Sequence, residues 1–172
     1  QYSNEKIFIS QEFIDKEPTK SDIQSVIIEE FIHHTTKEAF DKYVQFNNID
    51  KNGRITYTIN KDASGSELIL PAQLQTLISV YQQAFKHIAK KQGLDSLLSK
   101  INRNNNQLLS PNDLENELDA YRVSNIHEFI AGIFLKDESF AKEMSNTQYL
   151  NSDKTILEKY ADTLIRFFNR IL

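Results

Sequence analysis

Glycine and proline, the residues that most often interrupt regular structure, number only four and three among the 172 residues. With so few breaks available, the chain is expected to form long helices joined by short polar segments. The clearest example lies between Pro71 and Gly93, which would open and end a helix. Its apolar positions recur at helical spacing: Leu74, Leu77, Ile78, Tyr81, Phe85 and Ile88. This pattern predicts a mainly helical domain.

The first and last predicted helices carry apolar residues at similar spacing. Ser21 or Asp22 would cap the first helix, which is expected to reach Val44 and to be buried on several sides. Its apolar residues are Ile23, Val26, Ile27, Phe31 and Ile32. The last helix spans Thr155–Leu172, with Leu157, Tyr160, Leu164, Ile165, Phe168 and Ile171 as its buried face. Shorter helices are expected over Leu94–Ile101, Ser110–Tyr121, Asn125–Leu135 and Ser139–Met144.

Two short segments have the composition of strands. Lys6–Ile9 is a β-branched and aromatic run, and Arg54–Ile59 alternates apolar and polar residues. Asn47–Gly53 before the second strand reads as a turn, and Asp62–Ser66 after it reads as a loop. The fold class is therefore predicted as mainly α (α+β), with a small β element of short strands. Residues 1–172 would form one domain, and a start at Gln1 suggests a fragment of a larger polypeptide.

Composition and charge make several classes of function unfavourable. The net charge is -4 and the lysines and arginines are spread along the chain, so no nucleic-acid partner is expected. No apolar run approaches the ~20 residues of a membrane span, so no membrane partner is expected. There is no cysteine, which excludes disulfides and thiolate chemistry. Nothing in this chain resembles a signal peptide.

One segment combines acids and histidines on a helix. Glu29 and His33 stand at i and i+4, on one face, and Glu30 projects about 100° round the axis. Carboxylates on a buried helix are costly unless they are paired or bind a metal. The plainer interpretation is a partly exposed i,i+4 pair. His34 and His87 are expected to be surface residues or to have ordinary partners.

A second segment lies about 95 residues further on, Asn125-Ile126-His127-Glu128-Phe129-Ile130-Ala131-Gly132. Together the two segments resemble the two motifs of the zincin domain, a zinc-metallopeptidase fold found in large polyvalent proteins of bacteriophages and other mobile elements. The first family motif is His-Glu-x-x-His and the second is Asn-x-x-Glu-Phe-x-Ala-Glu. The resemblance covers most of the chain and implies a zincin-like helical domain.

The resemblance also implies roles for individual residues. His33 matches a zinc ligand, Glu30 the general base and Glu128 the third ligand. Glu29 occupies the position of the first ligand, where the family has histidine. Gly132 stands where the family usually has a second glutamate. Apart from the resemblance, two roles are open for Tyr121, which precedes the second motif: orienting a substrate oxyanion, or packing at the end of a helix.

The departure at Glu29 changes the expected chemistry. Two glutamates and one histidine would leave a bound Zn2+ formally neutral, so its water would be less acidic, and harder cations such as Mn2+ would compete better. Without metal, Glu29, Glu30 and Glu128 would crowd together, and the pKa of at least one should rise.

Two hypotheses follow from the resemblance. The first is a degenerate metallopeptidase-like domain, a structural or interaction module of a phage-type, virion-associated protein, with no zinc. Its partners would be other parts of a larger polypeptide or virion proteins. The second is an active metal-dependent peptidase that acts on a peptide substrate, with Glu29, His33 and Glu128 as ligands and Glu30 as general base. Either would reside in the bacterial cytoplasm or in a phage virion.

Overall fold

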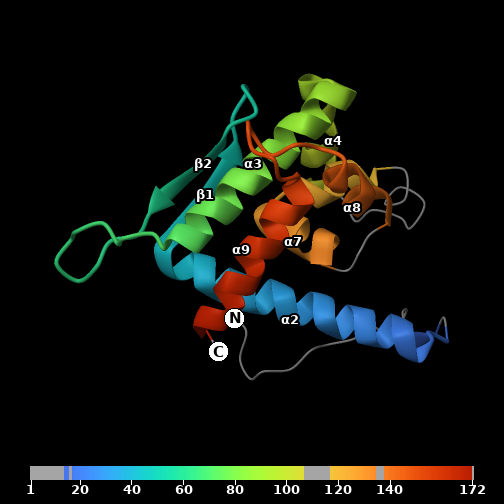
Figure 1. Cartoon of the computed structure of the whole chain (residues 1–172), viewed down its shortest axis with the longest axis horizontal. Helices are drawn as coiled ribbons and strands as arrows, with labels where there is room; N and C mark the ends of the chain where they lie inside the picture. Colours follow the sequence, from blue (N-terminus) through green and yellow to red (C-terminus); the bar gives the residue numbers. More distant parts are fainter. Residues whose placement is uncertain (1–13, 16, 107–116, 135–137, 172) are drawn as a thin grey trace.

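The computed structural model describes residues 14, 15, 17–106, 117–134 and 138–171. The predicted strand Lys6–Ile9 lies outside the described residues. The described chain is mainly helical with one small sheet, as predicted (Figure 1). Its elements are α2 (Lys20–Tyr43), β1 (Val44–Ile49), β2 (Ile55–Ile59), α3 (Ala72–Gln92), α4 (Leu94–Asn106), α6 (Leu118–Arg122), α7 (Ile126–Phe134), α8 (Glu138–Ser145) and α9 (Ile156–Ile171).

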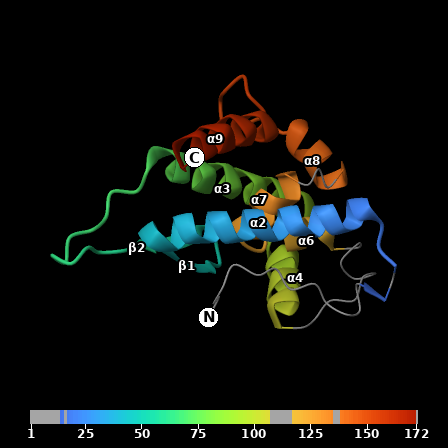
Figure 2. The ribbon, with the colours of Figure 1, turned by 90° about the horizontal axis from the view of Figure 1, so that it is seen from below.

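Helix α3 forms the centre of the core and confirms the predicted apolar stripe. Its buried residues are Leu74, Leu77, Ile78, Val80, Tyr81, Ala84, Phe85 and Ile88. Figures 1 and 2 both show α9 lying along α3. Gly93 ends α3 with φ +84°, a left-handed conformation that side chains with a Cβ rarely adopt. The sequence signal for the end of this helix was therefore correct.

Helix α2 differs from the prediction in its cap and in its burial. Thr19 caps it, and Asp22 bonds back to the backbone of Thr19 to complete a capping box. Only the C-terminal half is buried, through Ile32, Thr36 and Phe40. The N-terminal half exposes Ile27 (41%), Ile28 (41%) and Phe31 (57%), so the expectation of burial on several sides is wrong there. Consecutive positions point about 100° apart, and a single neighbouring helix cannot cover all of them.

The two strands form an antiparallel hairpin directly after α2. Its first strand, β1, includes Asn47–Ile49, which the sequence predicted as part of a turn. The turn itself is shorter and begins at Asp50, whose carboxylate accepts hydrogen bonds from the backbone of Asn52 and Arg54. The register is irregular between Phe46 and Ile49, which accommodates the two asparagines in the strand.

Helix α7 packs in the middle of the helical core. The ring of Phe129 lies 5.5 to 6.2 Å from the rings of Tyr81, Phe140 and Tyr160. The Tyr81 hydroxyl donates to the carbonyl of Val123 at 2.9 Å, and the Tyr160 hydroxyl donates to that of Ile130 at 2.7 Å. These two hydrogen bonds fix the turn before α7 and the middle of α7 itself.

The remaining helices follow the prediction with shifted ends. Of the predicted helix Ser110–Tyr121, residues 110–116 lie outside the described residues, and α6 accounts for its end. On α9, Tyr160 and Leu164 are buried as expected, but Ile165 is 60% exposed and Phe167 is buried instead. Ile165 follows Leu164 directly, and so it turns about 100° away from the core. None of the described helices combines the length and the apolar character needed to cross a bilayer.

Candidate metal centre

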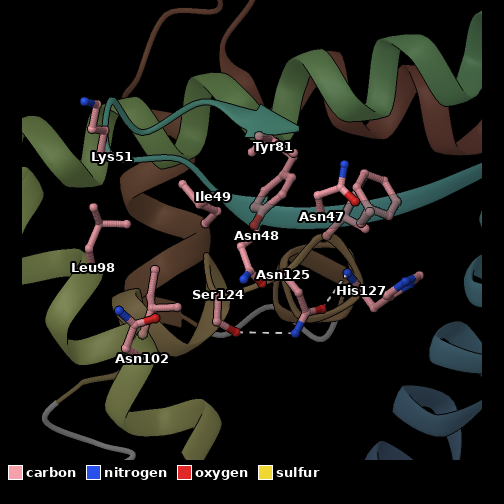
Figure 3. A pocket seen from close by; sticks show the side chains of 14 residues that line it. Asn47, Asn48, Ile49, Lys51, Tyr81, Leu98, Asn102, Ser124, Asn125 and His127 are labelled. Atoms are coloured by element: carbon pink, nitrogen blue, oxygen red, sulfur yellow. Dashed lines mark hydrogen bonds between the residues drawn. The ribbon is translucent and has the colours of Figure 1, made fainter. Parts of the chain in front are cut away.

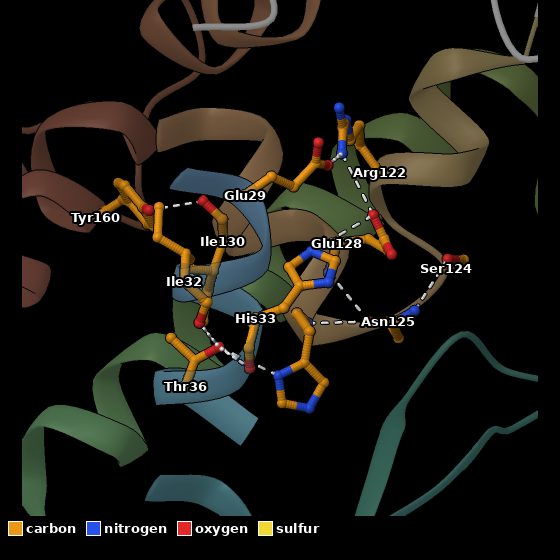
Figure 4. A network of polar contacts seen from close by, with 11 residues as sticks. Glu29, Ile32, His33, Thr36, Arg122, Ser124, Asn125, Glu128, Ile130 and Tyr160 are labelled. Carbon is orange, nitrogen blue, oxygen red and sulfur yellow. Dashed lines mark hydrogen bonds and ion pairs between the residues drawn. The ribbon is translucent and has the colours of Figure 1, made fainter. Parts of the chain in front are cut away.

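The two motifs come together because α2 and α7 pack against each other. On α2 the buried Thr36 hydroxyl bonds to the carbonyl of Ile32 at 2.7 Å and lies 3.3 Å from Nδ1 of His127 on α7 (Figure 4). Asn125 caps α7, since its side-chain oxygen accepts from the backbone N–H groups of His127 and Glu128, each at 3.0 Å. The cap fixes where α7 begins and therefore which residue of the second motif faces α2.

The three predicted ligands meet at this contact. One ligand atom each from Glu29, His33 and Glu128 lies within 4.8 Å of the others. Nε2 of His33 is 3.8 Å from Oε2 of Glu128. This nitrogen is buried and has no hydrogen-bond partner among the described residues. Such a nitrogen is unusual in a folded protein, and it is a natural metal-ligating atom.

A fourth residue, which the sequence did not single out, joins them. Nη1 of Arg122 lies 3.0 Å from Oε1 of Glu29 and 3.3 Å from Oε2 of Glu128 (Figure 4). The Arg122 side chain is only 11% exposed, and that of Glu128 only 14%. We call Arg122, Glu29, His33 and Glu128 the Arg122 cluster. A positive charge of the chain itself therefore stands between the two carboxylates.

Gly132 makes room for that arginine. A Cβ atom at this position would lie 2.5 Å from Cδ and 2.9 Å from Nε of Arg122. The position where the family usually has a glutamate is thus crossed by the arginine side chain. This contact explains the interior glycine, which costs about 1 kcal/mol of helix propensity relative to alanine. The only signal of this contact in the sequence was a glycine at a position expected to be acidic, ten residues after an arginine.

Burial shapes the electrostatics around Glu128. It raises the pKa of the Glu128 carboxyl, while His33, Tyr121 and Arg122 act in the opposite direction and Glu29 adds to the rise. The expectation that a carboxyl pKa would rise is confirmed for Glu128, but burial rather than crowding of acids is the main cause. Burial also raises the pKa of Tyr121, which hydrogen-bonds Glu128. Tyr121 therefore belongs to the surroundings of the cluster.

The other candidates lie elsewhere. Glu30, the predicted general base, is exposed on α2 and is not one of the three grouped ligands. His34 is exposed beside Glu38 at 3.4 Å, and His87 bonds to Glu143 at 2.5 Å. Both histidines have the ordinary surface or paired environments that were expected.

His127 contributes to the packing next to the cluster. Its ring contacts those of Phe40 and Phe46 edge-on, at 6.0 and 6.5 Å between centroids. Burial lowers the pKa of its imidazole to about 4, so the ring is neutral at pH 7. Its role in the structure is to join α2, α7 and the hairpin.

The fit to a divalent metal is mixed. Two carboxylates and one imidazole are a suitable donor set, and the unpartnered His33 nitrogen points to a ligand. Arg122, however, already engages an oxygen of each carboxylate. A metal bound to all three ligands would lie close to the guanidinium, and like charges at that distance repel. The set fits a metal only after Arg122 has moved.

A separate cavity of about 550 Å³ opens beside the start of α7 (Figure 3). Its polar lining includes Asn47, Asn48, Asn102 and Asn125, and its apolar lining includes residues of β1, β2 and α4. Of the Arg122 cluster, no member lines it. The size suits a small ligand, but the asparagines alone do not define which one.

Comparisons of this chain with protein-family models, with curated proteins and with solved structures gave no match. The likeness to zincins accordingly rests on the two motifs and on the side-chain grouping described above.

Proposed function

We propose that this domain is a metallopeptidase-like module without peptidase activity, in which Arg122 supplies the positive charge that a metal ion supplies in zincins. It would serve as a structural or interaction part of a larger phage-type, virion-associated protein. The observation that carries the proposal is the contact of one guanidinium nitrogen with both Glu29 and Glu128, at 3.0 and 3.3 Å.

The chemistry of arginine supports the loss of catalysis. A guanidinium has five donors, no acceptor and no accessible deprotonated form, so it neither binds nor activates a water nucleophile as zinc does. A catalytic zinc also needs an open coordination position beside three protein ligands. Here the carboxylates bond to Arg122 instead, and Glu30 lies exposed rather than grouped with the ligands.

The surface of α2 supports an interaction role. Its N-terminal half exposes Ile27, Ile28 and Phe31 within about one turn of the helix. Large apolar side chains gathered on a surface often mark contacts with another protein or domain. We therefore expect the N-terminal half of α2 to contact another part of the parent polypeptide or a virion protein.

A second candidate function is retained because of one observation. The buried Nε2 of His33 has no partner among the described residues, which favours a bound cation. In this alternative Glu29, His33 and Glu128 would ligate zinc or manganese and Glu30 would act as general base on a peptide substrate. Arg122 would then have to leave the carboxylates in the active state.

Metal content and peptide hydrolysis separate the two functions. Protein purified without chelator is expected to hold well under one equivalent of zinc or manganese by elemental analysis and to cleave no generic peptide. Stoichiometric metal, together with hydrolysis that both a chelator and Glu30→Gln abolish, would establish the peptidase instead.

The Glu29→His variant tests the likeness to zincins itself. It restores the family's first ligand and removes one of the two Arg122 contacts, so uptake of one zinc is expected. If the variant folds and takes up none, even when it is combined with Arg122→Gln, the site is not of the zincin type.

A further inference from the structure

We propose that Glu29, His33 and Glu128 form a latent divalent-cation site that Arg122 masks, and that Gly132 is the residue that lets Arg122 do so. The inference deepens the proposed function, because it explains how a ligand set can be retained without a bound metal. On this proposal, Arg122 and Gly132, which are not ligands themselves, control whether the three ligands bind a cation.

A single motion of Arg122 frees both carboxylates. The same atom, Nη1 of Arg122, makes the contacts with Glu29 and with Glu128. Arg122 is the last residue of α6, and the turn that follows is held separately by the bond from Tyr81 to the carbonyl of Val123. A change of side-chain rotamer at Arg122 therefore releases both carboxylates without moving α7.

Gly132 determines where the side chain of Arg122 lies. Cγ, Cδ and Nε of Arg122 all lie within 3.0 Å of where a Cβ of residue 132 would stand. Real Cβ contacts are longer, so any other residue at 132 would displace the arginine. The side chain is flexible, and so moving it is easier than moving the backbone of α7.

Departure of Arg122 would leave the ligand set without its neighbouring cation. Two carboxylates and a buried imidazole nitrogen would face one another with no positive charge between them. Uncompensated buried charges of this kind are unfavourable, and a divalent cation would remove that cost. The mixed oxygen and nitrogen donors suit Zn2+ and Mn2+. The masked site is therefore a site for these cations rather than for an anion or a neutral ligand.

The test compares cation binding by the full chain and its variants. Each protein is stripped with a chelator, and the binding of Zn2+ and of Mn2+ is measured by isothermal titration calorimetry. Arg122→Gln removes the masking charge, whereas Gly132→Ala keeps every charge and displaces the side chain. Both are expected to bind at least one of the cations about tenfold more tightly than the natural chain, or more, the scale on which neighbouring groups alter metal affinity.

Two controls decide whether the gain belongs to this site. Adding His33→Gln to Arg122→Gln should abolish it, because the imidazole ligand is lost. Lys91→Gln removes a cation that contacts Asp119 and Glu143 elsewhere on the surface, and it should leave the affinity unchanged. A gain that survives loss of His33, or an equal gain in Lys91→Gln, would overturn the proposal.

The remaining outcomes are also decisive. If the natural chain and Arg122→Gln bind the cations with equal affinity, the masking role is overturned. If Gly132→Ala does not fold, Arg122→Gln alone decides the question. A natural chain that already holds stoichiometric metal would refute the proposed function. The masking role would still stand if Arg122→Gln bound that metal more tightly, so the two failures are distinguishable.

Discussion

Two charged clusters in this domain contain similar residue types but differ in how exposed their cations are. In the Arg122 cluster, one guanidinium contacts two carboxylates between α2 and α7. In the second, which we call the Lys91 cluster (Lys91, His87, Asp119 and Glu143), one ammonium lies 3.1 Å from Glu143 and 3.6 Å from Asp119. Each has one cation, two acids and one histidine. The side chain of Arg122 is 11% exposed, whereas that of Lys91 is 50% exposed.

Burial of the cation, rather than the residue types, distinguishes the first cluster from the second. Solvated ion pairs contribute little to stability, because water competes with each contact and salt screens it. Partly buried charges must find partners inside the protein. Helix α6 makes the point directly, since it supplies Asp119 to the exposed cluster and Arg122, three residues later, to the buried one. The two clusters therefore differ chiefly in how well their cations are shielded, since Glu29 (27% exposed) and Asp119 (22%) are covered to a similar degree.

The largest expected effect comes from removing the buried cation. In the presence of chelator, Arg122→Met is expected to lower the free energy of unfolding by about 4 kcal/mol, because it leaves two carboxylates uncompensated. Chemical denaturation would measure the loss. The further replacements Glu29→Gln and Glu128→Gln should return most of it, since no buried charge then remains. A loss as small as that of an exposed pair would remove the distinction between the clusters.

A second prediction concerns the pH dependence beside the buried cluster. Burial lowers the pKa of His127 from 6.5 to about 4. Between these values the unfolded chain binds more protons at this residue than the folded chain does, so stability rises with pH. His127 should therefore lower the free energy of unfolding as the pH falls from 6.5 to 4, by at most about 3 kcal/mol.

The matched variants for this prediction are His127→Phe and His34→Gln. Phenylalanine keeps the aromatic contacts with Phe40 and Phe46 but cannot titrate, so the pH dependence of unfolding should flatten. His34 is exposed, with a side chain 49% accessible, and its replacement should leave the slope as it is. An unchanged slope in His127→Phe would assign the acid sensitivity to other groups.

The sequence predicted the long elements well and the local departures poorly. Helix α3 was clear because its stripe runs unbroken between Pro71 and Gly93. Strand β1 was missed, since it follows α2 with no glycine or proline between them and contains two asparagines that favour turns. The exposed face of α2 was also missed, because periodicity does not tell which apolar residues find a neighbour.

The candidate site, too, was partly predictable from the sequence and partly not. Helical spacing relates Glu29 to His33, and the second motif added Glu128, so the grouping of all three could be foreseen. Arg122 lies 93 residues from Glu29 in the sequence, in no motif, and only the packing of α6 against α7 brings it in. Its partner Gly132 looked merely like a lost acid. The role of a glycine that admits a neighbour's side chain becomes visible only in three dimensions.

The smallest expected effect comes from the exposed cluster and completes the comparison. Lys91→Met removes the same kind of contacts as Arg122→Met, yet it should cost less than about 1 kcal/mol in low salt. The ammonium of Lys91 is itself half exposed to water, and His87 remains 2.5 Å from Glu143 when it is removed. In about 1 M sodium chloride the Debye length falls to roughly 3 Å, so the cost at Lys91 should nearly vanish while most of that at Arg122 persists. Denaturation of both variants at two salt concentrations measures the difference. Equal salt sensitivity would mean that Arg122 is as well solvated as Lys91, and the masked-site proposal would lose its physical basis.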